Sequence, residues 1–324
     1  MSGVVEVGVS GVVEAGVSAT PRTLEVLAAG PLATVQDLGR AGLADLGVSR
    51  SGAADRGALR LANRLVGNNE AAAGIEFTLG GLVVRLTAAA TVAFTGARCE
   101  LSGFPGGWHT ALSCPAGTVL ALGTPSAGLR SYLAVRGGLA EPPVLGSRST
   151  DTLSGLGPAV LAAGRQLAIG TAAPGQPGED PGRPRERPGW PDGAEPLVTV
   201  GVAAGPRADW FCLDGLFDAR WQVLPDSNRI GTRLAGPALR LRPGFERAAA
   251  QLPSEPTLPG AVQVPPDGQP IVLGPDAPVT GGYPVVAVLP AAELDLLAQL
   301  RPGSGVRLVS LPIDPRSVAA GRPR

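Results

Sequence analysis

Residues 171–196 read TAAPGQPGEDPGRPRERPGWPDGAEP, and this stretch decides how the chain is organised. Twelve of its 26 residues are Pro or Gly. Proline cannot donate a backbone hydrogen bond, so neither a helix nor a central strand runs through such a segment. We therefore predict a linker at 171–196, a first domain at 23–170 and a second domain at 197–315, with an N-terminal extension at 1–22 and a tail at 316–324.

Short runs of β-forming residues lie on both sides of this linker, and the turn residues between them come from 47 Gly and 33 Pro. This pattern is typical of a mainly β protein, whose strands could close into barrels. A few covering helices are expected at 53–66 with Ser51 as N-cap, at 207–217 and at 291–300. The predicted strands are 24–27, 82–86, 91–94, 118–122, 131–136, 166–169, 197–202, 220–224, 238–241, 270–273, 285–289 and 306–310.

The predicted extension contains two nearly identical copies of an eight-residue unit, SGVVEVGV at 2–9 and SGVVEAGV at 10–17. Two copies are too few for a solenoid, which needs at least ~3 repeats. We expect these residues to lie outside the fold. The alternative is an added edge strand that docks a partner.

The charged residues exclude several kinds of chemistry. There are 27 basic and 27 acidic residues, and every basic residue is Arg. The zero net charge disfavours a nucleic-acid binder. The absence of Lys excludes a Schiff-base lysine, a P-loop lysine and a lysine that carries biotin or lipoate. The single His, His109, excludes a metal site with several His ligands.

The compartment is indicated by cysteine usage and by apolar runs. Cys99, Cys114 and Cys212 are far apart and form no C-x-x-C motif, which indicates reduced thiols in a cytoplasmic protein. The best apolar run, 82–94, is shorter than the ~20 residues of a membrane span and contains Arg85. We therefore expect no association with a membrane.

Two polar clusters lie before the predicted first helix. Residues 34–40 read TVQDLGR, and residues 47–55 read GVSRSGAAD. Ser51 and Asp55 flank the helix start, where free backbone N–H groups can hold an anion. Turn formation and helix capping are the alternative explanation of the same residues.

A denser polar cluster follows the predicted strand at 131–136. Arg136 ends that strand, and the later loop LGSRSTD at 145–151 contains Arg148 and Ser149. A guanidinium binds carboxylate or phosphate oxygens two at a time, so these residues could hold an anion. A solvated surface loop is the alternative.

The second half contains two further clusters. Residues 226–233 read DSNRIGTR and include Arg229. Residues 259–284 include Gln263, the turn signal Pro266-Asp267-Gly268, and a final TGGYP with Thr280 and Tyr283. The glycines allow close approach of a ligand to the backbone, although an ordinary hairpin and a tight turn explain the same pattern.

Sequence signatures of familiar sites are missing. The chain contains no G-x-x-x-x-G-K, no G-x-G-x-x-G and no H-E-x-x-H. Glu76 and Asp276 are possible carboxylate bases, but no paired geometry can be read from their positions. His109 would need an orienting partner to act as a base.

Seven segments, taken in order, resemble the biotin-dependent carboxyltransferase-like family, also called allophanate hydrolase subunit 2. Members of that family include the C subunit of 5-oxoprolinase, the KipA-type antagonist of a kinase inhibitor, and the carboxyltransferase portion of urea carboxylase. The resemblance extends from about Leu24 to Val309. The matching segments are 30–40, 47–55, 62–68, 132–138, 145–151, 227–234 and 260–284.

The resemblance implies two cyclophilin-like β-barrel domains and a protein that works with partners. A KipI-like B subunit and an A subunit would complete a 5-oxoprolinase, which uses ATP to open 5-oxo-L-proline to L-glutamate. A carboxyltransferase acting on urea or a related amide is one alternative, and its biotin would be carried by another protein. The other alternative is a KipA-type regulator that binds a KipI-type kinase inhibitor.

The resemblance also implies a substrate site shared with the partner. Arg136 and Arg148 would hold a carboxylate or a developing oxyanion. Amide or ureido groups would be oriented by Ser149, Gln263 and Thr280, and Tyr283 would close the pocket. Asp55 and Arg229 are further candidates for substrate binding, and no catalytic base is assigned.

Two departures from the family pattern concern threonines. Members often have two consecutive Thr before Val-Gln-Asp, and Ala33 replaces the first of them here. They also often have Thr-Thr-Gly-Gly-Tyr-Pro, and Val279 replaces the first Thr. Ile230 replaces the usual Met. The lost hydroxyls change either the contacts with substrate or only the hydrogen bonds of the turns.

Overall fold

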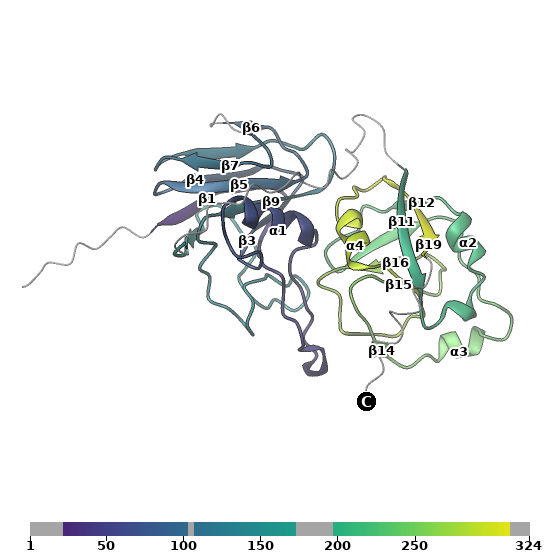
Figure 1. Ribbon diagram of the computed structural model, residues 1–324. Coiled ribbons are helices and arrows are strands. Elements are labelled where there is room, and N and C mark those ends of the chain that lie inside the picture. The colour runs from purple at the N-terminus through teal and green to yellow at the C-terminus, as the bar shows by residue number, and fades with distance from the viewer. Residues whose placement is uncertain (1–21, 103–106, 173–196, 312–324) are drawn as a thin grey trace, which may run out of the picture.

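The computed structural model describes residues 22–102, 107–172 and 197–311 (Figure 1). We call residues 22–172 the N-terminal half and residues 197–311 the C-terminal half. The predicted extension, nearly all of the predicted linker and the predicted tail lie outside the described residues, so those predictions remain predictions.

The N-terminal half consists of two five-stranded antiparallel sheets with one apolar core between them. Leu24, Leu82 and Leu120 come from one sheet, Phe77 and Phe94 come from the other, and all five are fully buried. One sheet has the order β10 (Gln166–Ala168), β1 (Thr23–Ala29), β4 (Leu82–Leu86), β8 (Val119–Leu122), β6 (Leu101–Ser102). The other has the order β2 (Leu32–Gln36), β3 (Gly74–Thr78), β9 (Arg130–Val135), β5 (Ala90–Gly96), β7 (Ala111–Cys114).

Helix α1 (Arg56–Leu65) covers the outer face of the second sheet. Its apolar residues recur at helical spacing, so one stripe containing Leu59 and Ala62 packs against Tyr132 and Ala134 of β9. Strand β9 is therefore covered on both faces, which explains why every residue of Arg130–Val135 is buried.

The C-terminal half is a closed seven-strand barrel. Its core contains Val200, Trp221, Leu234, Val272 and Leu308, all fully buried. All pairings between its strands are antiparallel except that of β11 with β19. The order around the barrel is β11 (Leu197–Ala204), β18 (Val285–Val288), β15 (Ala261–Gln263), β16 (Ile271–Leu273), β13 (Gly231–Ala235), β12 (Trp221–Val223), β19 (Gly305–Ser310).

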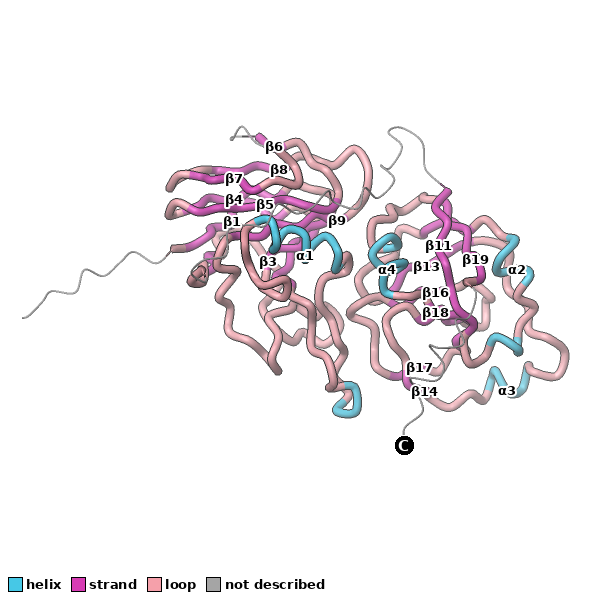
Figure 2. Tube along the Cα trace, in the orientation of Figure 1, coloured by secondary structure: helices cyan, strands magenta, loops and turns pink. Residues whose placement is uncertain are grey.

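Several short helices and one two-stranded ladder lie outside the sheets and the barrel (Figure 2). Strands β14 (Glu255–Pro256) and β17 (Thr280–Gly281) form a separate two-stranded ladder. The short helices are η1 (Ala44–Leu46), η2 (Ala208–Trp210), α2 (Asp214–Asp218), α3 (Glu246–Ala250) and α4 (Ala291–Leu297). Among the described residues, no helix combines the length and the apolar character that crossing a membrane requires.

The mainly β expectation is confirmed, and the C-terminal half closes into a barrel as expected. Every predicted strand is present except 238–241, which forms only an isolated bridge between Leu241 and Phe211. The helix predicted at 207–217 is two short pieces, η2 and α2, because Phe211 is extended between them. The strands that the sequence patterns missed are β2, β3, β6, β7, β13, β14, β15 and β17.

The predicted N-cap Ser51 is wrong. Asp55 caps α1, because its carboxylate accepts a hydrogen bond from the N–H of Ala58 at 2.9 Å. Ser51 lies four residues earlier in a left-handed conformation with φ of 52°, and it makes contacts with the C-terminal half.

Candidate functional site

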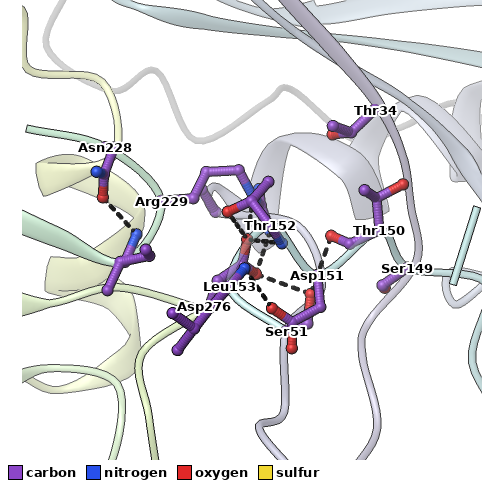
Figure 3. Close-up of polar contacts among 12 residues, drawn as sticks. Thr34, Ser51, Ser149, Thr150, Asp151, Thr152, Leu153, Asn228, Arg229 and Asp276 are labelled. Atoms are coloured by element: carbon purple, nitrogen blue, oxygen red, sulfur yellow. Dashed lines mark hydrogen bonds and ion pairs between the residues drawn. The ribbon is translucent and has the colours of Figure 1, made fainter. Parts of the chain in front are cut away.

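A buried ion-pair network joins the two halves around Arg229, and Figure 3 shows the part of it around Asp276. The guanidinium donates to both carboxylate oxygens of Asp276, at 2.8 Å and 2.9 Å, and to the carbonyl of Gly52 at 2.7 Å. It also donates to the carboxylate of Glu76 in the other half. The side chains of Arg229, Asp276 and Glu76 are at most 2 % exposed. We call these three residues the buried triad.

The protonation states in the buried triad follow from its geometry. Burial alone would lower the pKa of Arg229, but Glu76 and Asp276 reverse this and hold it above its ordinary value. Burial would raise the pKa of Asp276, but Arg229 and Thr152 hold it below its ordinary value. Arg229 and Asp276 are therefore both ionised at neutral pH. Both carboxylates of the triad already accept hydrogen bonds from Arg229.

Loops of the N-terminal half complete the shell around Asp276. The hydroxyl of Ser51 donates to one carboxylate oxygen at 2.8 Å, and Thr152 donates to the other through its N–H and its hydroxyl, at 3.0 Å and 2.7 Å. The Ser51 N–H donates to the carbonyl of Pro275. In this way the predicted cluster at 47–55 serves to attach one half to the other.

A chain of buried hydrogen bonds leads from Glu76 to the start of α1. The Tyr132 hydroxyl donates to Glu76 at 2.7 Å and accepts from the N–H of Asp55 at 2.7 Å. Burial, and then the charges of Glu76 and Asp55, raise the pKa of Tyr132 well above its usual range. Tyr132 is thus a fixed neutral group that positions the helix start.

Helix α4 makes a second set of contacts between the halves, beside α1 (Figure 1). The carboxylate of Asp295 accepts from the N–H groups of Arg56 and Gly57, at 2.8 Å and 3.1 Å. Gln299 donates to Asp55 at 2.8 Å and accepts from the N–H of Arg130 at 3.0 Å. The first N–H groups of α1 are therefore occupied, which leaves no anion site of the kind that the cluster at 47–55 could have formed.

A cavity of about 280 Å³ lies between these two sets of contacts. The N-terminal half contributes Arg50, Ser51, Ala53, Ala54, Arg56 and Arg130 to its lining. The C-terminal half contributes residues along the whole of α4, the loops at 258–259 and 274–275, and single residues that include Asn228 and Thr232. The lining is mostly apolar, and its three charged residues are all Arg.

Arg148 and Ser149 lie in a different place, in a loop organised by Asp37. The Asp37 carboxylate accepts from the hydroxyls of Ser147 and Ser149, at 2.7 Å and 2.6 Å, and from the N–H of Arg148 at 2.6 Å. Burial raises the pKa of Asp37, but these hydrogen bonds outweigh burial and the pKa is lowered. The Arg148 side chain donates to the carbonyl of Glu141 at 2.6 Å.

Gln263, Thr280 and Tyr283 gather at the edge of the barrel beside the β14–β17 ladder. Gln263 is buried, and its amide donates to the carbonyl of Tyr283 at 3.4 Å. Thr280 pairs with Pro256, and both Thr280 and Tyr283 are exposed. A Cβ on Gly281 would lie 2.5 Å from the Gln263 amide nitrogen, so glycine allows this close packing.

The structure therefore divides the eight predicted site residues among four places. Asp55 and Arg229 belong to the contacts between the halves, Arg148 and Ser149 to the Asp37 loop, and Gln263, Thr280 and Tyr283 to the barrel edge. Arg136 lies apart from all three groups, after β9, where its N–H donates to Thr91. Their binding of substrate stays a prediction.

The residues that sequence reasoning missed are Arg56 and Arg130, which line the cavity. Arg130 is the first residue of the predominantly apolar strand β9, so it was not recognised as a site residue. A charged residue there is a usable signal, because buried charges need partners. Within the described residues, no three His, Cys, Asp or Glu side chains come together as a metal site would require.

Residues 46–310 match the sequence model of a protein family that is described as carboxyltransferase domain, subdomain A and B. The chain belongs to this carboxyltransferase domain family. The family resemblance of the sequence motifs is thereby confirmed.

This carboxyltransferase-domain chain is similar to proteins of two kinds. It is 38 % identical over 302 residues to the 5-oxoprolinase C subunit of Escherichia coli K12, covering 90 % of this chain and 92 % of the relative. For the 5-oxoprolinase C subunit of Haemophilus influenzae the identity is 34 %, covering 88 % and 90 %. It is 34 % identical to urea amidolyase of Lachancea kluyveri, covering 90 % of this chain and 17 % of the relative.

Solved structures share the fold of this carboxyltransferase-domain chain. Urea amidolyase of K. lactis superposes with a TM-score of 0.79 at 30 % identity, over 92 % of this chain and 19 % of that one. The protein TTHA0988 superposes with a TM-score of 0.76 at 33 % identity, over 90 % of this chain and 56 % of that one. The chain spans only part of both proteins.

Proposed function

We propose that this chain is the C subunit of an ATP-dependent 5-oxoprolinase, which opens 5-oxo-L-proline to L-glutamate together with A and B subunits. The observation that carries the proposal is the match to a 5-oxoprolinase C subunit over 90 % of this chain and 92 % of the relative. A match along both chains favours a shared role more strongly than a match to a small part of a larger enzyme.

The chemistry explains why several subunits would be needed. A lactam is a poor electrophile, so the complex uses ATP to activate its oxygen before water adds. This chain has no Lys and none of the familiar phosphate-binding motifs, so another protein of the complex would hold ATP. We expect the chain to be inactive alone. Its three free cysteines fit a cytoplasmic complex.

The barrel edge is the proposed contact with a substrate shared between subunits. Tyr283 is 45 % exposed and lies on a glycine-rich turn, so a partner can approach it without displacing any buried side chain. Gln263 and Thr280 would orient the amide group there.

The test is reconstitution of the complex from the A, B and C subunits encoded in the same genome. ATP hydrolysis and glutamate release from 5-oxo-L-proline are measured with and without this chain. The proposal expects both activities to require it, and expects Tyr283→Ala to lower them. Arg233→Gln is the matched control, because Arg233 is similarly exposed in the same half and forms an ion pair with Asp226 at 2.9 Å. Full activity without the chain would overturn the proposal.

A carboxyltransferase acting on urea is the second candidate, because urea amidolyases match 90 % of this chain and share its fold. Biotin would then be carried by another protein. Avidin separates the two candidates, since it inhibits only a reaction that uses biotin. Binding of the B subunit without any turnover would instead favour a KipA-type regulator.

A further inference from the structure

We propose that the cavity between the two halves is a binding site for a small carboxylate with a compact uncharged body. Its identification with 5-oxo-L-proline, or with the glutamate formed from it, rests on the proposed function. It would be a second binding site for that molecule on this chain, because it lies between α1 and α4, apart from the barrel edge and the Asp37 loop.

The charge of the lining indicates an anionic ligand. Arg50, Arg56 and Arg130 face the cavity, and no Asp or Glu is among its lining residues. Asp295 accepts two N–H groups of α1 and Glu76 accepts from Arg229, so both of these acidic groups are already occupied. A carboxylate in the cavity would therefore meet three lining arginines and no lining acidic group.

Two of these arginines have unused hydrogen-bonding capacity. The Nε atoms of Arg56 and Arg130 are buried and have no hydrogen-bond partner, although buried polar groups nearly always have one. The Arg130 side chain is only 10 % exposed, and its Nε lies 3.7 Å from Glu76, too far for a hydrogen bond. Its Nη1 donates to the carbonyl of Ala298, which fixes the guanidinium against the cavity wall.

The surroundings of Arg56 also favour an added anion. Burial lowers the pKa of Arg56, and the positive charges of Arg50 and Arg60 lower it further, with only Asp295 opposing. Arg56 donates to the carbonyl of Leu38 at 3.2 Å, which holds its side chain in place. A bound carboxylate would relieve the repulsion among these like charges.

The size and the remaining lining limit the ligand. A cavity of about 280 Å³ is at the lower end of the ~300–1,000 Å³ range of small-molecule sites, so it suits a molecule of amino-acid size. Ala53, Pro259 and Leu294 form apolar walls, while Thr232 adds a hydroxyl to the lining. Arg50, Leu258 and Ala291 are exposed lining residues, so the cavity opens to solvent between them.

Binding to the purified full chain is measured by calorimetric titration with 5-oxo-L-proline and with L-glutamate. The lactam 2-pyrrolidinone, which lacks the carboxylate, and inorganic phosphate are the comparison probes. We expect 5-oxo-L-proline or glutamate to bind and 2-pyrrolidinone to bind at least about tenfold more weakly, as expected for the loss of a hydrogen bond to a charged group. Equal binding of 2-pyrrolidinone, or preference for phosphate, overturns the proposal.

Variants locate the site. Arg56→Gln removes the charge but leaves the α1 backbone contacts with Asp295, and we expect it to weaken binding about 10- to 100-fold. Ala291→Phe narrows the exposed mouth and should have a similar effect. Arg64→Gln is the matched control on the same helix, since Arg64 pairs with Glu70 outside the cavity. Unchanged binding in both cavity variants overturns the proposal.

The same variants in the reconstituted complex separate this proposal from the proposed function. If the complex turns over 5-oxo-L-proline and Arg56→Gln raises KM by the factor seen in binding, both are supported. Turnover that requires the chain but ignores Arg56→Gln and Ala291→Phe overturns the cavity as the site and keeps the function. Arg56-dependent carboxylate binding without turnover supports the cavity and overturns the 5-oxoprolinase role.

Discussion

Replacing Arg229 with methionine should destabilise the chain by about 4 kcal/mol at pH 7. The substitution keeps the volume of the side chain but removes the only cation that holds both carboxylates of the buried triad. Asp276 and Glu76 are 0 % and 2 % exposed at their side chains, so water cannot replace the lost guanidinium.

The size of this destabilisation follows from protonation, which is the least costly way for such a buried carboxylate to lose its uncompensated charge. An ordinary Asp pKa of 3.8 is about three units below pH 7. At about 1.36 kcal/mol per unit, neutralising Asp276 costs roughly 4 kcal/mol. This agrees with the ~3–5 kcal/mol lost when one partner of a buried ion pair is removed. Glu76 adds less, because Arg130 and Tyr132 remain beside it.

The assay is urea unfolding followed by circular dichroism at pH 7 and at pH 5. In the variant, the folded-state pKa of Asp276 lies above its unfolded value, so the folded state binds the extra proton and gains stability as the pH falls. The deficit relative to the unchanged protein should shrink by up to about 2.7 kcal/mol between the two pH values. Arg233→Met is the control: its ion pair with Asp226 is exposed and is worth under about 1 kcal/mol.

Two results would refute this reasoning. One is a loss below about 1 kcal/mol at pH 7, which would mean that the buried carboxylates do not need Arg229. The other is a loss of equal size at pH 5 and pH 7, which would show that no carboxylate takes up a proton. Adding Asp276→Asn to the variant should recover part of the lost stability, since it removes the uncompensated charge.

Three further outcomes are expected. Asp295→Ala removes the acceptor of two N–H groups of α1 and should lower the free energy of unfolding by about 1–2 kcal/mol in urea titrations. The folded-state pKa of Asp37 is below 3.8, so its carboxylate stabilises the fold above that pH and ceases to do so as the pH falls through the folded value. Asp37→Asn should therefore flatten the acid side of the stability profile, measured as the urea midpoint against pH. In a thiol titration, exposed Cys212 should react at once, whereas buried Cys99 and Cys114, whose pKa values are raised by burial, should react only after unfolding.

Each of these expectations has an outcome that contradicts it. An unchanged urea midpoint after Asp295→Ala would mean that the contact does not cap α1. An equally steep acid profile after Asp37→Asn would mean that other carboxylates dominate it. Rapid labelling of all three thiols in the folded protein would mean that the cores around Cys99 and Cys114 open readily.

Apolar strands could be predicted from the sequence, whereas strands with buried polar residues could not. The run at 82–86 was located at its true bounds, because Leu and Val dominate it. Strand β2 was missed, since Thr34 and Gln36 read as turn or surface residues. Both are buried in the structure because Gln36 donates to Thr34 and to the carbonyl of Thr150, which lies 114 residues later.

The site was harder to predict because its residues meet across long separations. Glu76 and Asp276 were noted as possible bases, but only the fold brings both to Arg229, which is 153 residues from Glu76. Arg56 and Arg64 are the same residue type on the same helix. Only the docking of α4 determines that Arg56 faces a cavity and that Arg64 does not. Periodicity within one segment contains no information about that docking.

The cap that Asp295 provides has a consequence for synthesis of the chain. Helix α1 ends at residue 65 and is synthesised some 230 residues before Asp295. At ~5–20 residues per second, this interval lasts roughly 10 to 50 seconds. During that time the N-terminal half has no Asp295 to accept the two N–H groups of α1. The contacts between the two halves can therefore be completed only after the last part of the C-terminal barrel has been synthesised. The two halves thus reach their final structure together, as one cooperative unit, at the end of translation.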